Sequence, residues 1–256
     1  MKEISSIHNP TVGSLRDLQK AKARREQGVF LADSVKMVRE AIDLMLCRTL
    51  IVVRGREGDY AQEIEKAEAL GCDVLLVTPA VMGALSEQKT PQGIMATVAI
   101  RPEVDKLTGN LIVAMDGVQD PGNVGTILRT ADAAGFDGAL LGAGCADLYG
   151  SKTLRATMGS IFRVPTGRTD DLPAALEEMK ARGYSVVATE LGGADFYANC
   201  PHENCVLVIG SEGRGVSEAV RAVATHHLAL PMRGGAESLN AAVAAGIMIY
   251  EMARQA

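Results

Sequence analysis

Three polar turns carry the side chains of this chain that could do chemistry. Each turn follows an apolar strand and opens a helix, and their polar side chains are Asn123, Arg129, Glu212, Ser238 and Asn240. The carboxyl ends of parallel strands meet at one edge of an α/β sheet, where such turns form a ligand crevice. The pattern therefore favours an enzyme or a nucleotide-type binding protein over a purely structural protein.

Each turn, taken alone, also has an ordinary structural explanation. Asn123 could cap a helix that begins at Val124. Arg129 lies inside that helix, where a solvated surface arginine is as good an interpretation as an anion-binding one. The glycine-rich segment 210–215 is as typical of a tight turn as of a ligand loop. The coincidence of three such turns is what favours a site.

Familiar nucleotide and metal motifs are absent from the sequence. Gly144 and Gly150 are separated by five residues rather than four, and Ser151 stands where a phosphate-binding loop has lysine. The segment 210–215 lacks the spacing of a dinucleotide fingerprint. The four histidines have no carboxylate or cysteine at ligand spacing, and no serine lies in a GxSxG turn. The sequence thus predicts no metal site and disfavours a hydrolase or a nucleotide-dependent oxidoreductase.

Composition is that of an ordinary globular protein. Hydrophobic residues make up 47% and charged residues 22% of the chain, which is enough for a sizeable core. No apolar run reaches membrane-spanning length, and the first residues lack an apolar signal region. The five cysteines show no CxxC pair, so reduced thiols without a chemical role are expected. We therefore expect a cytoplasmic protein with no membrane partner.

A local excess of positive charge lies near the amino terminus. The net charge of the chain is −5, which argues mildly against a uniformly basic nucleic-acid binder. Segment 16–25 nevertheless contains five basic residues and one acidic residue, Asp17. The basic side chains are Arg16, Lys20, Lys22, Arg24 and Arg25. Such a patch can hold a phosphate backbone, although a plain solvated helix face explains the charges equally well.

The chain is expected to form two α/β domains, at residues 1–100 and 111–256, joined by a charged linker at 101–110. In the first domain we predict helices at 10–22, 35–45, 60–70 and 79–85, and strands at 29–32, 50–53, 74–77 and 94–99. In the second we predict strands at 111–115, 139–141, 161–164, 185–189, 206–209 and 227–230, and helices at 124–134, 151–158, 172–182, 216–224 and 239–252. These strands are continuous apolar runs, in which polar and apolar residues do not alternate. Such runs predict a parallel sheet covered on both faces.

The three turns match, in order, the motifs of a known enzyme family. Segments 123–131, 207–215 and 230–244 resemble the three motifs of the SpoU (TrmH-like) RNA ribose 2′-O-methyltransferases, members of the SPOUT superfamily. The first 100 residues resemble the substrate-binding domain often attached to that family, through Arg24-Arg25, Phe30-Leu31 and the segment 90–94. The resemblance covers nearly the whole chain.

The resemblance implies a particular fold and cofactor. The fold would be a carboxy-terminal SPOUT domain with a parallel sheet and a trefoil knot, plus a small amino-terminal α/β domain that binds RNA. It further implies an obligate homodimer, with the cofactor pocket in the knot and near the subunit interface. The cofactor would be S-adenosylmethionine. The residues implied to hold it are Thr189, Gly210, Leu230, Met232 and Leu239.

The resemblance also assigns roles to the polar side chains. Arg129 matches an arginine regarded as essential and proposed as the proton acceptor. An arginine pKa of roughly 12.5 to 13.8 favours instead a grip on the adjacent phosphate and on the developing alkoxide. Asn123 is expected to orient Arg129 or the ribose, and Glu212 to pair with Arg129 or to brace the second turn. Ser238 and Asn240 are expected to shape the pocket and to help hold the nucleotide.

Two positions depart from the pattern of the family. Asp33-Ser34 stands where members often carry Glu-Gly, which bears on RNA preference. The third motif continues as Asn240-Ala241-Ala242-Val243 rather than Asn-Val-Ser-Val, which removes a hydroxyl beside the pocket.

The predicted function is methylation of a ribose 2′-hydroxyl in RNA, with ribosomal RNA favoured and transfer RNA as the alternative. A non-catalytic RNA-binding or assembly factor that keeps the fold is the competing class. The intact set of polar side chains in the three turns counts against that class.

Overall fold

The computed structural model describes residues 1–255 and divides the chain into two compact units. The first unit contains residues 1–102 and the segment 149–159, and the second contains 103–148 and the chain from 160 onward. Residues 103–110, expected as a linker, group with the second unit, where Leu107 is buried in the core. Segment 149–159 groups with the first unit although it lies inside the sequence of the second.

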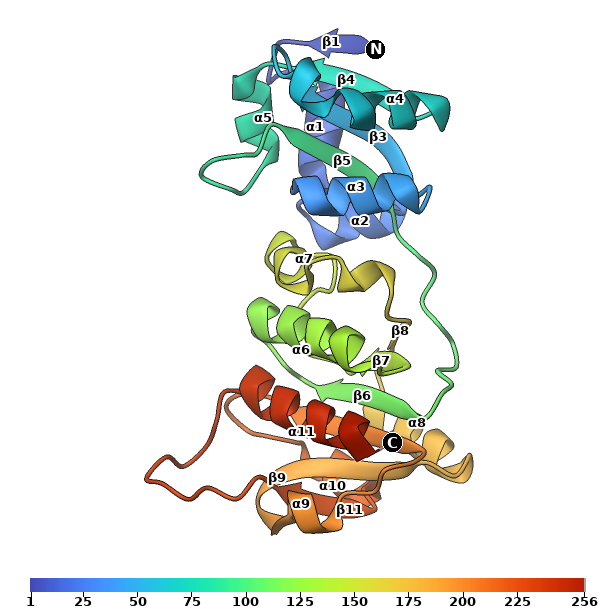
Figure 1. Cartoon of the computed structure of the whole chain (residues 1–256), viewed down its shortest axis with the longest axis vertical. Coiled ribbons are helices and arrows are strands. Elements are labelled where there is room, and N and C mark those ends of the chain that lie inside the picture. The colour runs from blue at the N-terminus through green and yellow to red at the C-terminus, as the bar shows by residue number, and fades with distance from the viewer. Residues whose placement is uncertain (256) are drawn as a thin grey trace. The chain divides into compact units, whose positions relative to one another are not determined.

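The first unit is built on a five-stranded sheet in the order β1-β4-β3-β5-β2 (Figure 1). Its strands are β1 (Lys2–Ile4), β2 (Val29–Ala32), β3 (Cys47–Val53), β4 (Asp73–Val77) and β5 (Ile94–Ala99). Its helices are α1 (Pro10–Asp17), α2 (Ala21–Gln27), α3 (Val35–Asp43), η1 (Glu57–Tyr60), α4 (Ala61–Ala69), α5 (Pro79–Leu85) and α7 (Ser151–Thr157). Strands β1, β4 and β3 are parallel, whereas β5 runs antiparallel to both β3 and β2.

Helices cover both faces of this sheet. On one face α1 and α5 pack their apolar side chains, such as Leu15 and Met82, against Ile51 and Leu75 of the strands. Helices α3 and α4 contact β3, β4 and β5. Burial of apolar surface on two faces is what stabilises a domain of this size.

The predicted helix at 10–22 is divided in two, and the division explains an unexpected burial. Helix α1 ends at Asp17 and α2 begins at Ala21. The break leaves backbone carbonyls without helical partners. The guanidinium of Arg24 donates to the carbonyl oxygens of Leu18 and Gln19 at 2.7 and 2.8 Å. Arg24 is accordingly only 5% exposed.

Asp33 and Ser34, the residues that depart from the family pattern, both have structural roles. The hydroxyl of Ser34 accepts a hydrogen bond from the amide of Met37 and so caps α3. The carboxylate of Asp33 lies 3.4 Å from the guanidinium of Arg155 on α7.

Two further contacts hold segment 149–159 in the first unit. Tyr149 packs on Phe30 with ring centroids 5.2 Å apart, and Ser151 donates to Glu87.

The second unit is built on a six-stranded sheet in the order β11-β9-β10-β6-β7-β8, and every pair in it is parallel. Its strands are β6 (Leu111–Asp116), β7 (Gly138–Leu141), β8 (Thr166–Arg168), β9 (Ser185–Asp195), β10 (Cys205–Gly210) and β11 (His226–Ala229). Its helices are α6 (Pro121–Ala134), η2 (Ser160–Phe162), α8 (Leu172–Ala181), α9 (Phe196–Asn199), α10 (Glu218–Val223) and α11 (Ala241–Gln255). The predicted parallel sheet is confirmed.

This sheet is also buried on both faces, as apolar strands without alternation require. Leu176 of α8 and Val220 of α10 pack on one face against strand residues such as Ile112 and Val208. Helices α6 and α11 pack against each other and contact β7 and β10 respectively, as Figure 1 shows.

Three element predictions in the second unit were wrong. Residues 160–162 form a 3-10 helix, and the strand comes later, at Thr166–Arg168. Ile161 and Phe162 are apolar because this helical turn is buried, not because they belong to a strand. Helix α6 begins at Pro121 rather than Val124, and Asp120 caps it by accepting from the amide of Asn123 at 2.9 Å. Strand β9 continues to Asp195, since its far end pairs with β11 beyond a bulge.

Within residues 1–255, no helix combines the length and the apolar character needed to cross a membrane. The five cysteines are all free thiols. Burial raises the pKa of Cys47, beside Cys72, and the pKa of Cys200 to about 12. These two thiols are therefore protonated and poor nucleophiles at neutral pH.

Candidate active site

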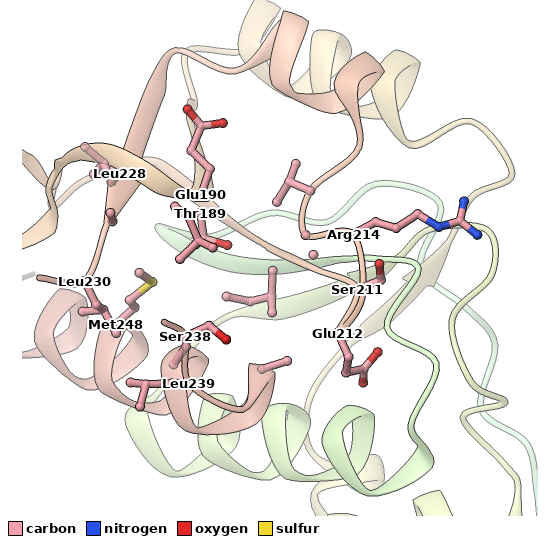
Figure 2. A pocket seen from close by; sticks show the side chains of 18 of the residues that line it. Thr189, Glu190, Ser211, Glu212, Arg214, Leu228, Leu230, Ser238, Leu239 and Met248 are labelled. Atoms are coloured by element: carbon pink, nitrogen blue, oxygen red, sulfur yellow. The ribbon is translucent and has the colours of Figure 1, made fainter. Parts of the chain in front are cut away.

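A pocket of about 490 Å³ lies at the carboxyl ends of β10 and β11 and beside the middle of β9 (Figure 2). All five residues predicted to hold the cofactor line it, and they are Thr189, Gly210, Leu230, Met232 and Leu239. Glu212 and Ser238, predicted as catalytic, line it as well. The second and third polar turns of the sequence are thus brought to one cavity by β10 and β11, which are parallel and lie on either side of β9.

The second turn is closed by reciprocal backbone hydrogen bonds. The amide of Ser211 donates to the carbonyl of Gly215 at 3.0 Å, and the amide of Gly215 donates back to Ser211 at 2.9 Å. A Cβ atom at Gly210 would lie 2.0 Å from the carbonyl carbon of Gly215. Only glycine at position 210 lets the turn fold back this closely on the end of β10.

Glu212 fastens this turn to the loop after β6. One carboxylate oxygen accepts from the side-chain amide of Asn123 at 2.7 Å and from the backbone amide of Asp120 at 3.2 Å. The other accepts from the amide of Gln119 at 3.2 Å. Partial burial raises the pKa of Glu212, but hydrogen bonds from Asn123 and from nearby amides outweigh that effect and hold the pKa below its ordinary value of 4.5. Glu212 is thus an ionised brace at neutral pH.

Asn123 connects all three turns. Its side chain is 8% exposed. It donates to Glu212 in the second turn, and its oxygen accepts from the side-chain amide of Asn240 in the third turn at 3.1 Å. The predicted role of Asn123 as a helix cap was wrong, because Asp120 takes that position.

Asn240 has two roles in the third turn. Its side-chain oxygen accepts from the amides of Ala242 and Val243 at 2.9 and 3.2 Å, which satisfies free N–H groups at the start of α11. Its amide nitrogen is left to donate to Asn123. Asn240 therefore fixes the start of α11 relative to α6.

The pocket wall combines apolar and polar groups. Its apolar side chains include Leu228, Leu230, Leu239 and Met248, and Figure 2 shows these four on one side of the cavity. Ser211, Glu212 and Arg214 of the second turn lie on the other side. The hydroxyl of Thr189 donates to the carbonyl of Val208 at 2.9 Å, which fixes the middle of β9 against β10. Such a cavity suits a ligand with a flat apolar part and several polar groups.

Arg129 is outside the lining of this pocket. It lies on α6, where its side chain is exposed. Among the residues that the structure describes, it makes no ion pair or side-chain hydrogen bond. Of the two roles expected for Glu212, the structure has the brace of the second turn rather than the pairing with Arg129, since the carboxylate is occupied by Asn123 and backbone amides. Asn123 does not contact Arg129 through a hydrogen bond either; its polar atoms face Glu212 and Asn240.

The predicted basic patch is smaller than the sequence indicated. Lys20, Lys22 and Arg25 are exposed, with Lys20 paired to Asp17 at 2.8 Å and Lys22 to Glu26 at 3.8 Å. Arg24 must be removed from the patch, because it is buried and bonded to the carbonyls at the end of α1.

Sequence reasoning missed several pocket residues, of which Glu190, Arg214 and Arg221 are the charged ones. Glu190 directly follows Thr189 on β9, and Arg221 lies on α10. The available signal was the polar residue at the end of an apolar strand. Glu190 was not included among the predicted site residues because β9 was expected to end at Thr189.

Comparison with known proteins identifies the family. A family model described as the SpoU rRNA Methylase family matches residues 110–250, which is more than half of the chain. The chain belongs to this family. A second model, the MRM3-like substrate binding domain, matches residues 9–96. Among curated SpoU-type relatives, the chain is 37% identical over 253 residues to the 23S rRNA (guanosine(2553)-2′-O)-methyltransferase RlmP of Bacillus subtilis, covering 98% of this chain and 99% of the relative.

Solved SpoU methyltransferases share the fold over nearly the full length. The AdoMet-bound rRNA methyltransferase from Sinorhizobium meliloti matches with a TM-score of 0.88 and 35% identity, covering 99% of this chain and 97% of that one. The SpoU methyltransferase AviRb from Streptomyces viridochromogenes, in complex with AdoMet, matches with a TM-score of 0.87 and 28% identity, covering 97% of this chain and 98% of that one. The predicted family and two-part α/β architecture are confirmed.

Proposed function

We propose that this protein transfers the methyl group of S-adenosylmethionine to a ribose 2′-hydroxyl of RNA, with ribosomal RNA as the substrate. The observation that carries the proposal is a pocket lined by the second and third motif turns, to which the first turn is joined by the chain of hydrogen bonds from Asn240 through Asn123 to Glu212. The SpoU relatives named as rRNA methyltransferases or holding AdoMet support it.

The pocket residues fit the chemistry of this cofactor. The apolar group of Leu228, Leu230, Leu239 and Met248 can sandwich a purine ring, and strand-end backbone groups beside Thr189 and Gly210 can read its polar edge. Met232 and Ser238, of the third turn, also line the cavity. When bound, the cofactor supplies a methyl group already activated by a positively charged sulfur.

The protein then has two tasks, which are to position the ribose and to stabilise charge. Arg129 carries a permanent positive charge on an exposed face of α6, without an internal carboxylate partner among the described residues. A guanidinium so placed can bind the phosphate next to the target ribose and stabilise negative charge on the 2′-oxygen, which would take the methyl group from sulfur and release its proton to solvent. Arg129 lies outside the pocket lining, so bound RNA must span from this side chain to the cavity.

Asn123, Glu212 and Asn240 act by holding the three turns in one geometry. Methyl transfer demands an in-line arrangement of the attacking oxygen, and small displacements of positioning groups cost large factors in rate. These side chains satisfy one another and the backbone, so we assign them to positioning rather than to proton transfer.

The first unit supplies RNA binding in this proposal. Its sequence matches a substrate binding domain, and Lys20, Lys22 and Arg25 are exposed basic residues close together in the sequence. Phosphate contacts by such side chains position RNA without reading its sequence.

We also propose that the chain forms a homodimer. Val243, Ile247 and Tyr250 are apolar and between 38% and 54% exposed, and their spacing of four and three residues puts them on one face of α11. A second copy would cover this face.

We further propose that the second unit contains the trefoil knot of the SPOUT fold. We also propose a cytoplasmic location, which the free thiols support.

The decisive experiment follows the methyl group. The protein is incubated with tritium-labelled S-adenosylmethionine and either unmodified ribosomal RNA or unmodified transfer RNA, and the RNA is then digested with alkali. Methylation of a 2′-oxygen blocks cleavage, so the label should survive in alkali-resistant dinucleotides from ribosomal RNA. The first nucleotide to examine is the one equivalent to the guanosine named for the Bacillus subtilis relative.

Three results would contradict the proposal. Label on bases would exclude ribose chemistry, and label in transfer RNA alone would exclude the ribosomal substrate. Absence of label with every RNA, despite cofactor binding, would favour a non-catalytic assembly factor.

A further inference from the structure

A carboxylate that the catalytic scheme does not use lines the same pocket. Glu190 lies on β9 directly after Thr189, and its side chain is 24% exposed. Figure 2 places Glu190 beside Thr189 and on the far side of the cavity from Glu212. It therefore belongs to a different part of the pocket from the brace of the three turns.

Two side chains, one from β11 and one from α10, hold this carboxylate in place. Nδ1 of His227, on β11, lies 3.3 Å from one oxygen of Glu190. Nη1 of Arg221, on α10, lies 3.7 Å from the other oxygen. A carboxylate has about four lone-pair sites on its two oxygens, so one contact to each oxygen leaves acceptor capacity on both. Glu190 is thus oriented but not saturated.

The remaining hydrogen-bond acceptor capacity of Glu190 suits a pair of neighbouring hydroxyl groups. Two neighbouring hydroxyls present a pair of donors that a carboxylate accepts in parallel, and charge-assisted hydrogen bonds of this kind are strong. Acidic side chains at the end of a strand recognise ribose hydroxyls in dinucleotide sites for the same reason. A ribose is attached directly to the purine, and the apolar residues Leu228 and Leu230 lie on the Glu190 side of the cavity.

We propose that Glu190 binds the 2′- and 3′-hydroxyls of the cofactor ribose, with Arg221 and His227 as the side chains that orient it. This inference rests on the proposed function only in taking S-adenosylmethionine as the cofactor. It assigns to β9 a side-chain contact that sets specificity for a ribonucleoside.

The test is a cycle of two ligands and two proteins, measured by isothermal titration calorimetry on the full chain. The ligands are S-adenosylhomocysteine and its analogue without the two ribose hydroxyls, and the proteins are wild type and Glu190→Gln. Wild type should bind the analogue at least about tenfold more weakly, as the loss of bonds to a charged group requires. In Glu190→Gln this ratio should shrink to about threefold or less, because the amide forms weaker bonds to the diol.

Controls separate binding from folding. Glu177→Gln changes a carboxylate that is ion-paired with Lys180 and lies outside the pocket lining, so it should keep the wild-type ratio. If Glu190→Gln fails to fold, judged by thermal melting, Glu190→Asp should also reduce the ratio because the shorter side chain cannot reach both hydroxyls.

The outcomes distinguish this inference from the proposed function. If loss of the two ribose hydroxyls weakens binding by the same factor in wild type and in Glu190→Gln, and both bind S-adenosylhomocysteine, the role of Glu190 is overturned. The methyltransferase proposal is then left intact. No binding of S-adenosylhomocysteine to wild type overturns both. An analogue without the amino group, tested in parallel, should be weakened equally in the two proteins. A loss confined to wild type would assign Glu190 to the cofactor amine instead.

Discussion

The side-chain amide of Asn240 donates a hydrogen bond of 3.1 Å to the side-chain oxygen of Asn123, which lies 117 positions earlier in the chain. Asn123 in turn donates to Glu212 at 2.7 Å. Three turns from three separate parts of the sequence are therefore joined by two side-chain hydrogen bonds. Because both bonds depend on the amide group of an asparagine, the network can be tested by replacing one atom at a time.

Asn240→Asp should separate the two roles of this side chain. The carboxylate keeps the oxygen that caps α11, but it loses the donor and brings negative charge toward the oxygen of Asn123 and toward Glu212. We expect helix content to be retained, stability to fall by about 1 to 2 kcal/mol, and kcat/KM to fall at least about tenfold. Circular dichroism, chemical unfolding and methylation assays measure the three quantities. Thr126→Ala on the exposed face of α6 should change none of them, and wild-type kcat/KM in Asn240→Asp would exclude a positioning role.

Arg129→Ala should abolish methylation without affecting the pocket. Its side chain is exposed and does not line the cavity, so cofactor affinity should stay within about twofold and stability within about 0.5 kcal/mol. Loss of transition-state stabilisation should lower kcat/KM by at least about a hundredfold. Arg129→Lys, which keeps the charge without the planar fork, should recover only part of the rate. The assignment fails if Arg129→Ala methylates RNA normally, or if the variant loses cofactor binding in proportion to activity.

Glu212 should make stability depend on pH in the acidic range. Its pKa in the folded protein lies below the ordinary value of 4.5, because hydrogen bonds to the carboxylate outweigh the effect of burial. Its contribution is therefore fully present above 4.5 and is lost as pH falls through the lowered pKa. The difference in melting temperature between wild type and Glu212→Gln should be constant near neutral pH and should shrink below 4.5. A difference that grows on acidification would contradict the hydrogen-bonded carboxylate.

The basic segment near the amino terminus should divide into two functional classes. Replacing Lys20, Lys22 and Arg25 by glutamine should weaken RNA binding and reduce its salt dependence, with the slope falling by roughly 0.7 for each phosphate of single-stranded RNA that is no longer neutralised. Arg24→Gln should instead destabilise the first unit by about 2 kcal/mol or more, because one buried and one part-buried carbonyl lose a charged donor. Filter binding at several salt concentrations and thermal melting distinguish them. An unchanged salt slope in the triple variant would assign those lysines and Arg25 to plain solvation.

The exposed apolar face of α11 should control assembly. Wild type should elute with twice the chain mass of 26.9 kDa when measured by light scattering. A charged double variant, Val243→Glu with Tyr250→Glu, should be monomeric, because two desolvated carboxylates cannot be buried at an apolar contact. Leu70→Glu, at an exposed apolar residue of the first unit, should leave the mass unchanged. A monomeric wild type would overturn the dimer.

The element types and the family followed from local signals, and the errors have identifiable physical causes. Apolar runs such as 206–209 and 111–115 predicted parallel strands because burial on both faces leaves no polar alternation. The failures occurred where a long-range partner decides local structure. Strand β9 extends past Thr189 because β11 pairs with it, and the helix at 10–22 breaks where Arg24 can take up the free carbonyls.

The polar side chains could be picked out as candidates from the sequence because three such turns coincide, although each turn alone has an ordinary structural explanation. Their partners could not. No local feature of the sequence indicates that Glu212 binds Asn123 rather than Arg129, or that Arg24 is buried while Arg25 is exposed. Nor does one indicate that Glu190 lines the pocket and contacts Arg221 and His227. Hydrogen bonds and ion pairs act over about 3 Å, so they are decided only when the sheet order brings distant strand ends together.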